Sequence, residues 1–158
     1  MLIEEVKFKE ISPKFGENNP LKDKCILYWD ISKKKDILSE IVENDKRLQH
    51  FLKILQFFFI RKENQYKDEL YRKENYGIPN LVVAMKFLGN ASIFGNLRIY
   101  CQEHKINGKY HIVMSRVVTK KGNSVRNYER TIISNVASEM YLDDIKELEM
   151  LKRPRRVR

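Results

Sequence analysis

The chain has 158 residues, of which 42% are hydrophobic and 33% are charged, and its formal net charge is +10. This length and composition predict one folded domain with a real core, and they argue against a disordered or low-complexity chain. No apolar run reaches the roughly 18 residues that a membrane span needs, and the N-terminus lacks the long apolar stretch of a signal peptide. The two cysteines cannot make a disulfide framework or, by themselves, a zinc site. We therefore expect a cytoplasmic protein without a metal, a cofactor or a membrane partner.

The positive charge is concentrated in two parts of the chain. Residues 86–130 hold nine basic and two acidic side chains, whereas residues 131–151 hold one lysine and five carboxylates. The last seven residues, KRPRRVR at 152–158, add five positive charges. A general excess of lysine would be spread evenly, so this pattern indicates a surface for an anionic partner, with nucleic acid as the first candidate.

The first half of the chain predicts an N-terminal arm, a strand and a pair of helices. Residues 1–24 are an arm, or a strand at Val6–Ile11 followed by a loop rich in turn-forming residues. Residues 25–31, CILYWDI, are aromatic and β-branched and predict a strand. Apolar residues then recur every three to four positions, which predicts two helices, or one bent helix, over 33–74. We expect Phe57, Phe58 and Phe59 to pack in the core rather than to stack on bases.

The second half of the chain changes to the period of strands. Three strands are expected at 81–88, 97–104 and 110–120, and Asn107-Gly108 predicts a tight hairpin turn between the last two. A helix capped by Asn123 or Ser124 follows, with a further helical turn from Asp143 to Leu151.

These elements predict an α+β fold. We expect a small antiparallel sheet, made of the three-stranded C-terminal meander and an N-terminal strand, with two helices before the meander and one after it. Residues 25–151 would form a single domain, and residues 152–158 a basic tail. The sheet should have one buried face and one basic face toward solvent.

Alternation along the strands places several polar side chains on that second face. Arg98 and Tyr100 lie on one side of their strand, and Lys86 is the only charge in the preceding strand. In the third strand Met114 and Arg116 are expected to share a face, and the sequence leaves open whether that face is the one of Arg98. An arginine grips phosphate through two parallel hydrogen bonds, and tyrosine stacks on unpaired bases.

Over residues 80–141 the chain resembles a known family. The likeness lies in FGNLRIYC at Phe94–Cys101, in YHIVMSRVVTKKG at Tyr110–Gly122 and in the helix expected near Ser124. An arginine on the middle strand, a Lys-Lys pair ending the next strand and a following helix are similar to the HigB-like members of the RelE/HigB superfamily. These proteins are the toxins of type II toxin–antitoxin pairs. The order strand, two helices, three-stranded meander and helix is also similar.

The resemblance implies a metal-independent endoribonuclease that cleaves mRNA, often on the ribosome, and is silenced by a co-expressed acidic antitoxin. In that chemistry the RNA 2′-hydroxyl attacks the adjacent phosphate and leaves a 2′,3′-cyclic phosphate, which requires a base, an acid and positive charge at the phosphate. By motif position, Arg98 would hold the scissile phosphate, and Lys120 and Lys121 would stabilise its charge. The predicted catalytic residues are Arg98, Lys120, Lys121 and Tyr128, and the predicted substrate-binding residues are Lys86, Tyr100, Arg116 and Arg126.

The general base stays open at this point. Tyr128 and Glu129 come early in the last helix and can point at the Lys pair, although Tyr128 also fits the apolar stripe of that helix and would then pack in the core. His104, His111 and Tyr100 are the other candidates, and no motif selects among the five.

Two other functions fit the same residues. A non-catalytic RNA- or DNA-binding protein would use the basic face and the tail, and its affinity would fall steeply with salt while RNA stayed intact. A protein-interaction factor would use the face to bind an acidic partner. One branch of the RelE/HigB superfamily acts on DNA gyrase, and the sequence leaves that target open as well.

Overall fold

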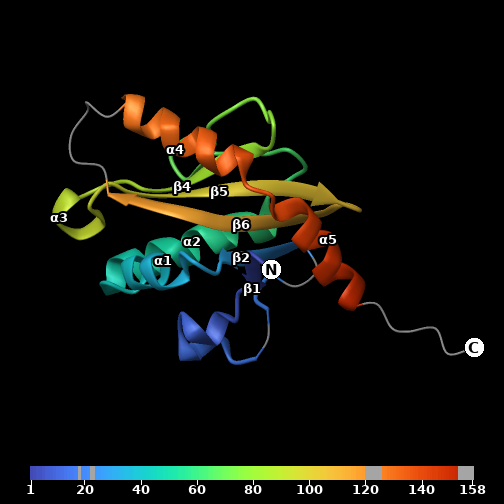
Figure 1. Cartoon of the computed structure of the whole chain (residues 1–158). Coiled ribbons are helices and arrows are strands. Elements are labelled where there is room, and N and C mark those ends of the chain that lie inside the picture. The colour runs from blue at the N-terminus through green and yellow to red at the C-terminus, as the bar shows by residue number, and fades with distance from the viewer. Residues whose placement is uncertain (18, 22–23, 120–125, 153–158) are drawn as a thin grey trace, which may run out of the picture.

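The computed structural model describes residues 1–17, 19–21, 24–119 and 126–152. These residues form a six-stranded sheet in the order β1-β2-β6-β5-β4-β3 (Figure 1). The strands are β1 (Ile3–Glu5), β2 (Cys25–Asp30), β3 (Tyr71–Lys73), β4 (Leu81–Phe87), β5 (Leu97–Ile106) and β6 (Lys109–Thr119).

The sheet is mixed, because β2 runs parallel to β6 while the other neighbours are antiparallel. The predicted small antiparallel sheet is therefore wrong. Strands β1 and β3 extend it at its two edges, and β2 joins β6 rather than forming a hairpin. Parallel neighbours need a long crossover, and here all the elements between β2 and β6 supply it. Such a pairing joins segments far apart in the chain, so no local pattern reveals it.

Five α-helices accompany the sheet in the described part of the chain. They are α1 (Lys34–Ile41), α2 (Asp45–Ile60), α3 (Ala91–Phe94), α4 (Arg126–Ser138) and α5 (Tyr141–Leu151). In Figure 1, α1 and α2 lie on one face of the sheet, and α4 and α5 lie on the other. The expected pair of helices before the meander is present, whereas a single helix after it is wrong. Gln102 donates to the carbonyls of Val136 and Glu139 at 2.8 and 3.0 Å, where α4 ends and before α5 begins. The expected caps of α4, Asn123 and Ser124, lie outside the described residues.

Helix α2 ends at Ile60, although helical spacing predicts helix as far as residue 74. Arg61 leaves the helix with extended backbone (φ −61°, ψ 143°), and its guanidinium lies 2.7 Å from the carboxylate of Glu103 on β5. Tyr71, which begins β3, is fully buried and donates to the same carboxylate. A continuous helix could not bring both side chains to Glu103, so this buried polar contact holds the segment against the sheet.

The N-terminal segment also differs from its predicted form. Strand β1 lies at Ile3–Glu5, and the strand expected at Val6–Ile11 is replaced by a 3-10 helix at Phe8–Glu10, with a second at Pro13–Phe15. The apolar residues of this region are nonetheless in the core: Val6, Phe8, Ile11 and Leu21 are all buried.

The meander forms as predicted. Strands β4, β5 and β6 are consecutive antiparallel neighbours, and Ile106 pairs with Lys109 across the turn. Asn107 and Gly108 have φ values of 52° and 78°, the left-handed conformations that the commonest two-residue hairpin turn requires.

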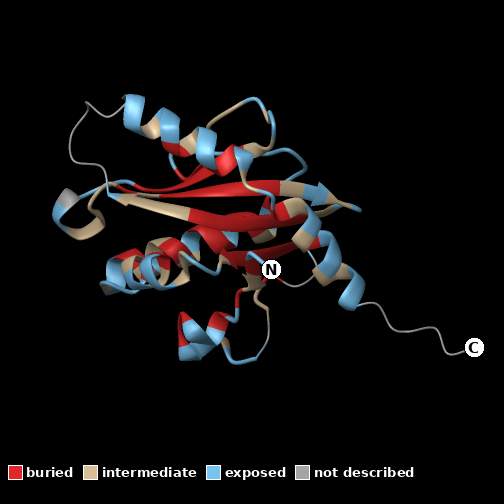
Figure 2. Ribbon diagram, in the orientation of Figure 1, coloured by how far each residue is buried: buried red, intermediate tan, exposed pale blue. Residues whose placement is uncertain are grey.

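Buried residues lie in the strands and in helices on both sides of the sheet (Figure 2), and apolar clusters pack on both faces. The largest cluster lies between the sheet and the α1–α2 pair and includes Trp29, Phe57 and Phe58, so the expected core position of those two phenylalanines is confirmed, whereas Phe59 packs against this cluster and is only partly buried. Smaller clusters lie under α5 and α4. The prediction of one face turned wholly to solvent is therefore wrong, because two helices cover much of it. No helix among the described residues is long and apolar enough to cross a membrane.

Candidate functional site

A β-bulge in β6 decides which side chains share the face under α4. Tyr100 of β5 is opposite Arg116, but the next pair joins Cys101 to Met114, which leaves Ser115 as an extra residue. Directly opposed residues of neighbouring strands lie on the same face, and a bulge shifts the alternation by one. Arg116 is therefore on the face of Tyr100, whereas Met114 packs in the large core on the other side. The predicted shared face of Met114 and Arg116 is wrong for this reason.

Four basic side chains, one from each of four neighbouring strands, lie on this face. Across β4 and β5, Lys86 is opposite Arg98. The adjacent row runs across all four strands as Arg72, Ala84, Tyr100 and Arg116. We call Arg72, Lys86, Arg98 and Arg116 the cationic cluster. Strands β3 to β6 thus carry two adjacent rows of positive charge, although each strand contributes only one cation.

Lys86 and Arg98 are more enclosed than surface cations usually are. Lys86 is 6% exposed, and Arg98 is half-buried. Burial lowers the pKa of Lys86, and the nearby charges of Arg98 and Arg72 lower it further. Neither side chain forms an ion pair with a described residue, and Nε of Arg98 has no hydrogen-bond partner among them. Cations that are partly desolvated and not neutralised attract an anion strongly.

Two carboxylates and a phenol lie beside these cations. Glu74 follows β3, and Glu129 lies in the first turn of α4. Burial, followed by the charges of Glu129 and Glu74, raises the pKa of the fully buried Tyr100 to about 12, with Arg98 acting in the opposite direction. Burial also raises the pKa of Glu74. Titratable groups that burial perturbs beside cations are typical of sites that transfer protons.

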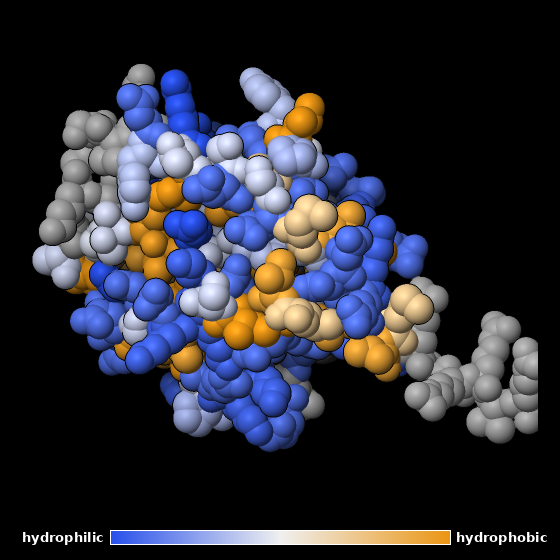
Figure 3. Space-filling model, in the orientation of Figure 1, coloured by the Kyte–Doolittle hydropathy of each residue, from blue (hydrophilic) through white to orange (hydrophobic). Residues whose placement is uncertain are grey.

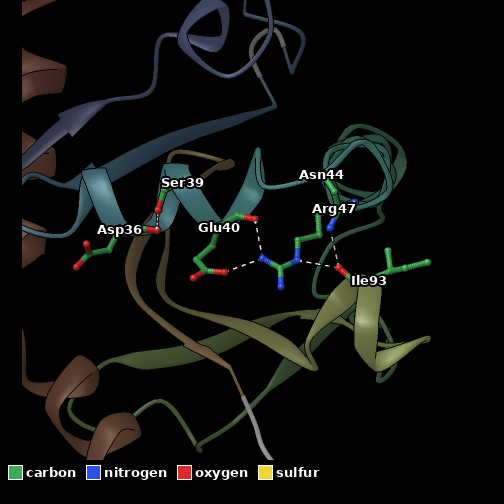
Figure 4. Close-up of polar contacts among 6 residues, drawn as sticks. All are labelled: Asp36, Ser39, Glu40, Asn44, Arg47 and Ile93. Atoms are coloured by element: carbon green, nitrogen blue, oxygen red, sulfur yellow. Dashed lines mark hydrogen bonds and ion pairs between the residues drawn. The ribbon is translucent and has the colours of Figure 1, made fainter.

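An arginine on the opposite face holds the connection between β4 and β5. In Figure 4, the guanidinium of Arg47 on α2 lies between Glu40 of α1 and Ile93 of α3. Its Nη1 is 2.6 Å from Oε2 of Glu40, and its Nε donates to the carbonyl of Ile93 at 3.0 Å. Gly95 has φ +61°, and a Cβ there would come within 2.8 Å of Nη2 of Arg47. The two strands that carry the most enclosed cations of the cluster are therefore joined by a fixed connection.

The structure brings together every predicted substrate-binding side chain that it describes, and Arg98 with them. Lys86, Tyr100 and Arg116 surround Arg98 on adjacent positions of β4, β5 and β6. Tyr100 is fully buried, so it supports the platform from within and does not offer a ring for stacking.

The other predicted residues come at or just before the start of α4 in the sequence. Lys120 and Lys121 are outside the described residues, as is the side chain of Arg126. Tyr128 is 58% exposed, so the core position that its place in the apolar stripe predicts is wrong. Its hydroxyl makes no hydrogen bond within the described part of the chain, and its catalytic role stays a prediction.

Arg72 and Glu74 are the members of this site that sequence reasoning missed. Both fall in the segment predicted as the end of a helix, where strand alternation is not considered. The available signal was the run Tyr71 to Glu74 directly before a Gly- and Pro-containing turn and a strong strand. That arrangement is typical of a short edge strand in a hairpin.

His104 and His111, two of the candidate bases, lie toward the other end of this face. They are opposite each other in β5 and β6. Nδ1 of His111 is 2.9 Å from the hydroxyl of Tyr28, and burial lowers the pKa of this histidine to about 4. Nε2 of His104 is 2.6 Å from Oε1 of Gln102. Both rings thus belong to polar contacts of the interior and not to the cationic cluster.

The side of the molecule shown in Figure 3 is mostly hydrophilic, with smaller hydrophobic patches that include the surface along α5. Met150 and Leu151 at the end of α5 are 68% and 74% exposed. In the described ranges, no group of three or more His, Cys, Asp or Glu side chains is arranged to hold a metal ion. Comparisons with protein-family models, with curated proteins and with solved structures find no match for this chain.

Proposed function

We propose that this chain is the endoribonuclease toxin of a toxin–antitoxin pair, which binds RNA on the cationic cluster and cleaves it without a metal ion. The observation that carries this proposal is the meeting of Lys86 and Arg98 with Glu74 on one face. A phosphate needs the two cations, and its cleavage by a neighbouring hydroxyl needs a group that moves a proton.

The two cations have different tasks at the phosphate. The planar guanidinium of Arg98 can donate two parallel hydrogen bonds to phosphate oxygens and so orient the group. Lys86 supplies a compact charge from a partly desolvated position, where it acts more strongly than in water. Both would oppose the negative charge that builds up on the five-coordinate phosphorus. Arg72 and Arg116 extend the positive surface along the RNA on either side.

The resemblance to the RelE/HigB superfamily supports RNA as the substrate. The element order that carries it occurs here as β2, α1, α2, the meander β4–β6 and α4, to which β1, β3, α3 and α5 are additions. It also supports a co-expressed acidic antitoxin as the partner that neutralises the cluster, and the cytoplasm as the place of action.

A non-catalytic RNA- or DNA-binding protein is the second candidate, because the four cations alone suit any phosphate backbone. The decisive measurement is induced expression of the wild type with mapping of RNA ends, followed by cleavage of isolated RNA in EDTA. We expect growth arrest and cleavage products that end in a 2′,3′-cyclic phosphate.

Arg98→Ala should lower the cleavage rate by about 10²–10³-fold, because it removes a preorganised donor at the phosphate. Lys35→Ala on α1, which removes an exposed charge from the other side of the sheet, is the matched control and should cleave as the wild type does. Circular dichroism checks that both variants fold. A fully toxic Arg98→Ala variant would contradict the assigned site. Intact RNA bound by the wild type with a steep salt dependence would establish the binding protein instead.

A further inference from the structure

Glu74 is held by the sheet at a fixed place beside the cationic cluster. Its backbone N–H donates to the carbonyl of Val82 on β4 at 2.9 Å, directly after the last pair of β3. Side chains two residues apart in an extended chain share a face, so Glu74 and Arg72 lie on the same side. That side is the one on which Val82 packs against α4. The carboxylate is therefore on the face that carries the cluster.

One oxygen of this carboxylate is buried and lacks a donor. Oε1 of Glu74 is shielded from solvent, and no described residue donates a hydrogen bond to it. Buried acceptors are normally satisfied, but this oxygen is not, and neither are Nε of Arg98 and the hydroxyl of Tyr100 on the same face. A glutamate with only a structural task would pair with one of the nearby cations. Without a donor, this oxygen does not stabilise the ionised form of the carboxyl, and because Glu74 is only half-buried a substrate hydroxyl would meet the carboxylate from its exposed side.

The surroundings of Glu74 favour a group that gains and loses a proton. Burial, and after it the charge of Glu129, raise the pKa of its carboxyl, whereas the positive charges of Arg72, Arg98 and Lys86 act to lower it. A base is most effective when its pKa is close to the working pH, because it is then both ionised and strongly proton-accepting. Burial moves the pKa of Glu74 upward, toward the working pH.

We propose that Glu74 is the general base that accepts the proton of the attacking RNA 2′-hydroxyl, an inference that rests on the proposed function. The Glu74 carboxylate takes the proton as the 2′ oxygen–hydrogen bond breaks, and the 2′-oxygen forms a bond to phosphorus. The bond from phosphorus to the 5′-oxygen breaks, and that oxygen leaves with a proton taken from solvent. Glu74 returns its own proton to solvent. The products are a 2′,3′-cyclic phosphate and a 5′-hydroxyl.

The other candidate bases are less suited to this step. With a pKa raised to about 12, Tyr100 keeps its proton near neutral pH. The ring of His111 is bonded to Tyr28 away from the cluster. Glu129 is the second carboxylate near the cluster and therefore provides the most informative comparison.

The test measures single-turnover cleavage of an RNA oligonucleotide that contains a site mapped with the wild type. The Glu74→Gln variant is compared with Glu69→Gln, an exposed glutamate before β3 that carries the same change of charge. We expect Glu74→Gln to slow cleavage by about 10²–10⁴-fold, the usual contribution of a general base. Its affinity for the oligonucleotide with a 2′-deoxy residue at the cleavage position should be no weaker than that of the wild type. Glu69→Gln should cleave normally.

The pH profile distinguishes a base from a structural residue. The wild-type rate should rise with pH as Glu74 loses its proton, and this limb should be absent in Glu74→Gln. A Glu74→Gln variant that cleaves at the wild-type rate, or that keeps the limb, overturns the assignment and leaves the proposed function standing. Loss of the limb in Glu129→Gln instead overturns it in the same way. A wild type that binds RNA without cleaving it refutes the proposed function itself.

Discussion

Two groups of charged side chains lie on opposite faces of this sheet, and they are built in opposite ways. On the α2 side, Arg61 and Glu103 form an ion pair at 2.7 Å, with both side chains 2% exposed. The ring of Tyr110 lies 3.9 Å from the guanidinium carbon of Arg61. In the cationic cluster, Lys86 and Arg98 have no paired carboxylate among the described residues.

The paired charges of Arg61 and Glu103 therefore support the fold, whereas the unpaired charges of the cationic cluster are available to a ligand. Glu103 accepts hydrogen bonds from the hydroxyls of Tyr66 and Tyr71 at 2.5 and 3.0 Å in addition to its ion pair. A buried charge is tolerated when it is paired and hydrogen-bonded in this way. The cationic cluster lacks such internal neutralisation, so an external anion is the partner that its charges favour.

The largest expected effect falls on the buried pair. Arg61→Met should lower the free energy of unfolding by about 3–5 kcal/mol, because it leaves the Glu103 carboxylate buried without its counter-charge. Urea denaturation of the purified protein measures this loss. Arg98→Ala is the contrasting variant and should lose less than about 1 kcal/mol, since it breaks no internal ion pair. Equal losses in the two variants would remove the distinction between the two groups.

A smaller effect on the free energy of unfolding is expected from the titration of His111, and it can be measured apart from activity. His111 has a folded pKa of about 4, below its ordinary value of 6.5, because it is buried as the neutral ring. As pH falls from about 6.5 to about 4 the unfolded chain takes up this proton first, so stability should fall by about 1–3 kcal/mol and then change no further. Urea titrations of the wild type and His111→Gln across this range test the slope.

In His111→Gln that slope should be missing. The variant therefore allows the acid limb of cleavage, which we assign to Glu74, to be measured without a simultaneous loss of fold. If the wild type and His111→Gln lose stability in parallel, the histidine is not the group that titrates.

The smallest expected effect is that of Tyr100→Phe. The hydroxyl of Tyr100 is buried and has no hydrogen-bond partner within the described residues, so its removal leaves nothing unpaired. The free energy of unfolding should stay within about 0.5 kcal/mol of the wild type, as the urea midpoint will show. A clear loss of stability would mean that this face satisfies its own polar groups, as the Arg61–Glu103 side does.

Features encoded in neighbouring residues could be predicted from the sequence. The alternating strands of the meander and the Asn107-Gly108 turn depend on contacts close in the chain, and they form as expected. The platform of Lys86 and Arg98 follows from those strands, since both lie on strands whose alternation is regular between them.

Features that depend on distant contacts could not be predicted in this way. Helical spacing continues past Ile60, but a carboxylate on β5 draws Arg61 and Tyr71 inward, and this contact ends the helix. For the same reason, β3 and Glu74 were predicted to be part of a helix. The bulge at Ser115 has no local signature either, because strict alternation is the only periodicity that a strand pattern offers.

That bulge gives β6 one residue more than its pairing with β5 requires. Removing the single codon for Ser115 would make Arg116 follow Met114 directly, which restores regular alternation and leaves Arg116 on the face of Tyr100 and Met114 in the core. Natural variants of this gene should therefore lose one residue at the bulge more readily than elsewhere in the strand, where a deletion would exchange the two faces.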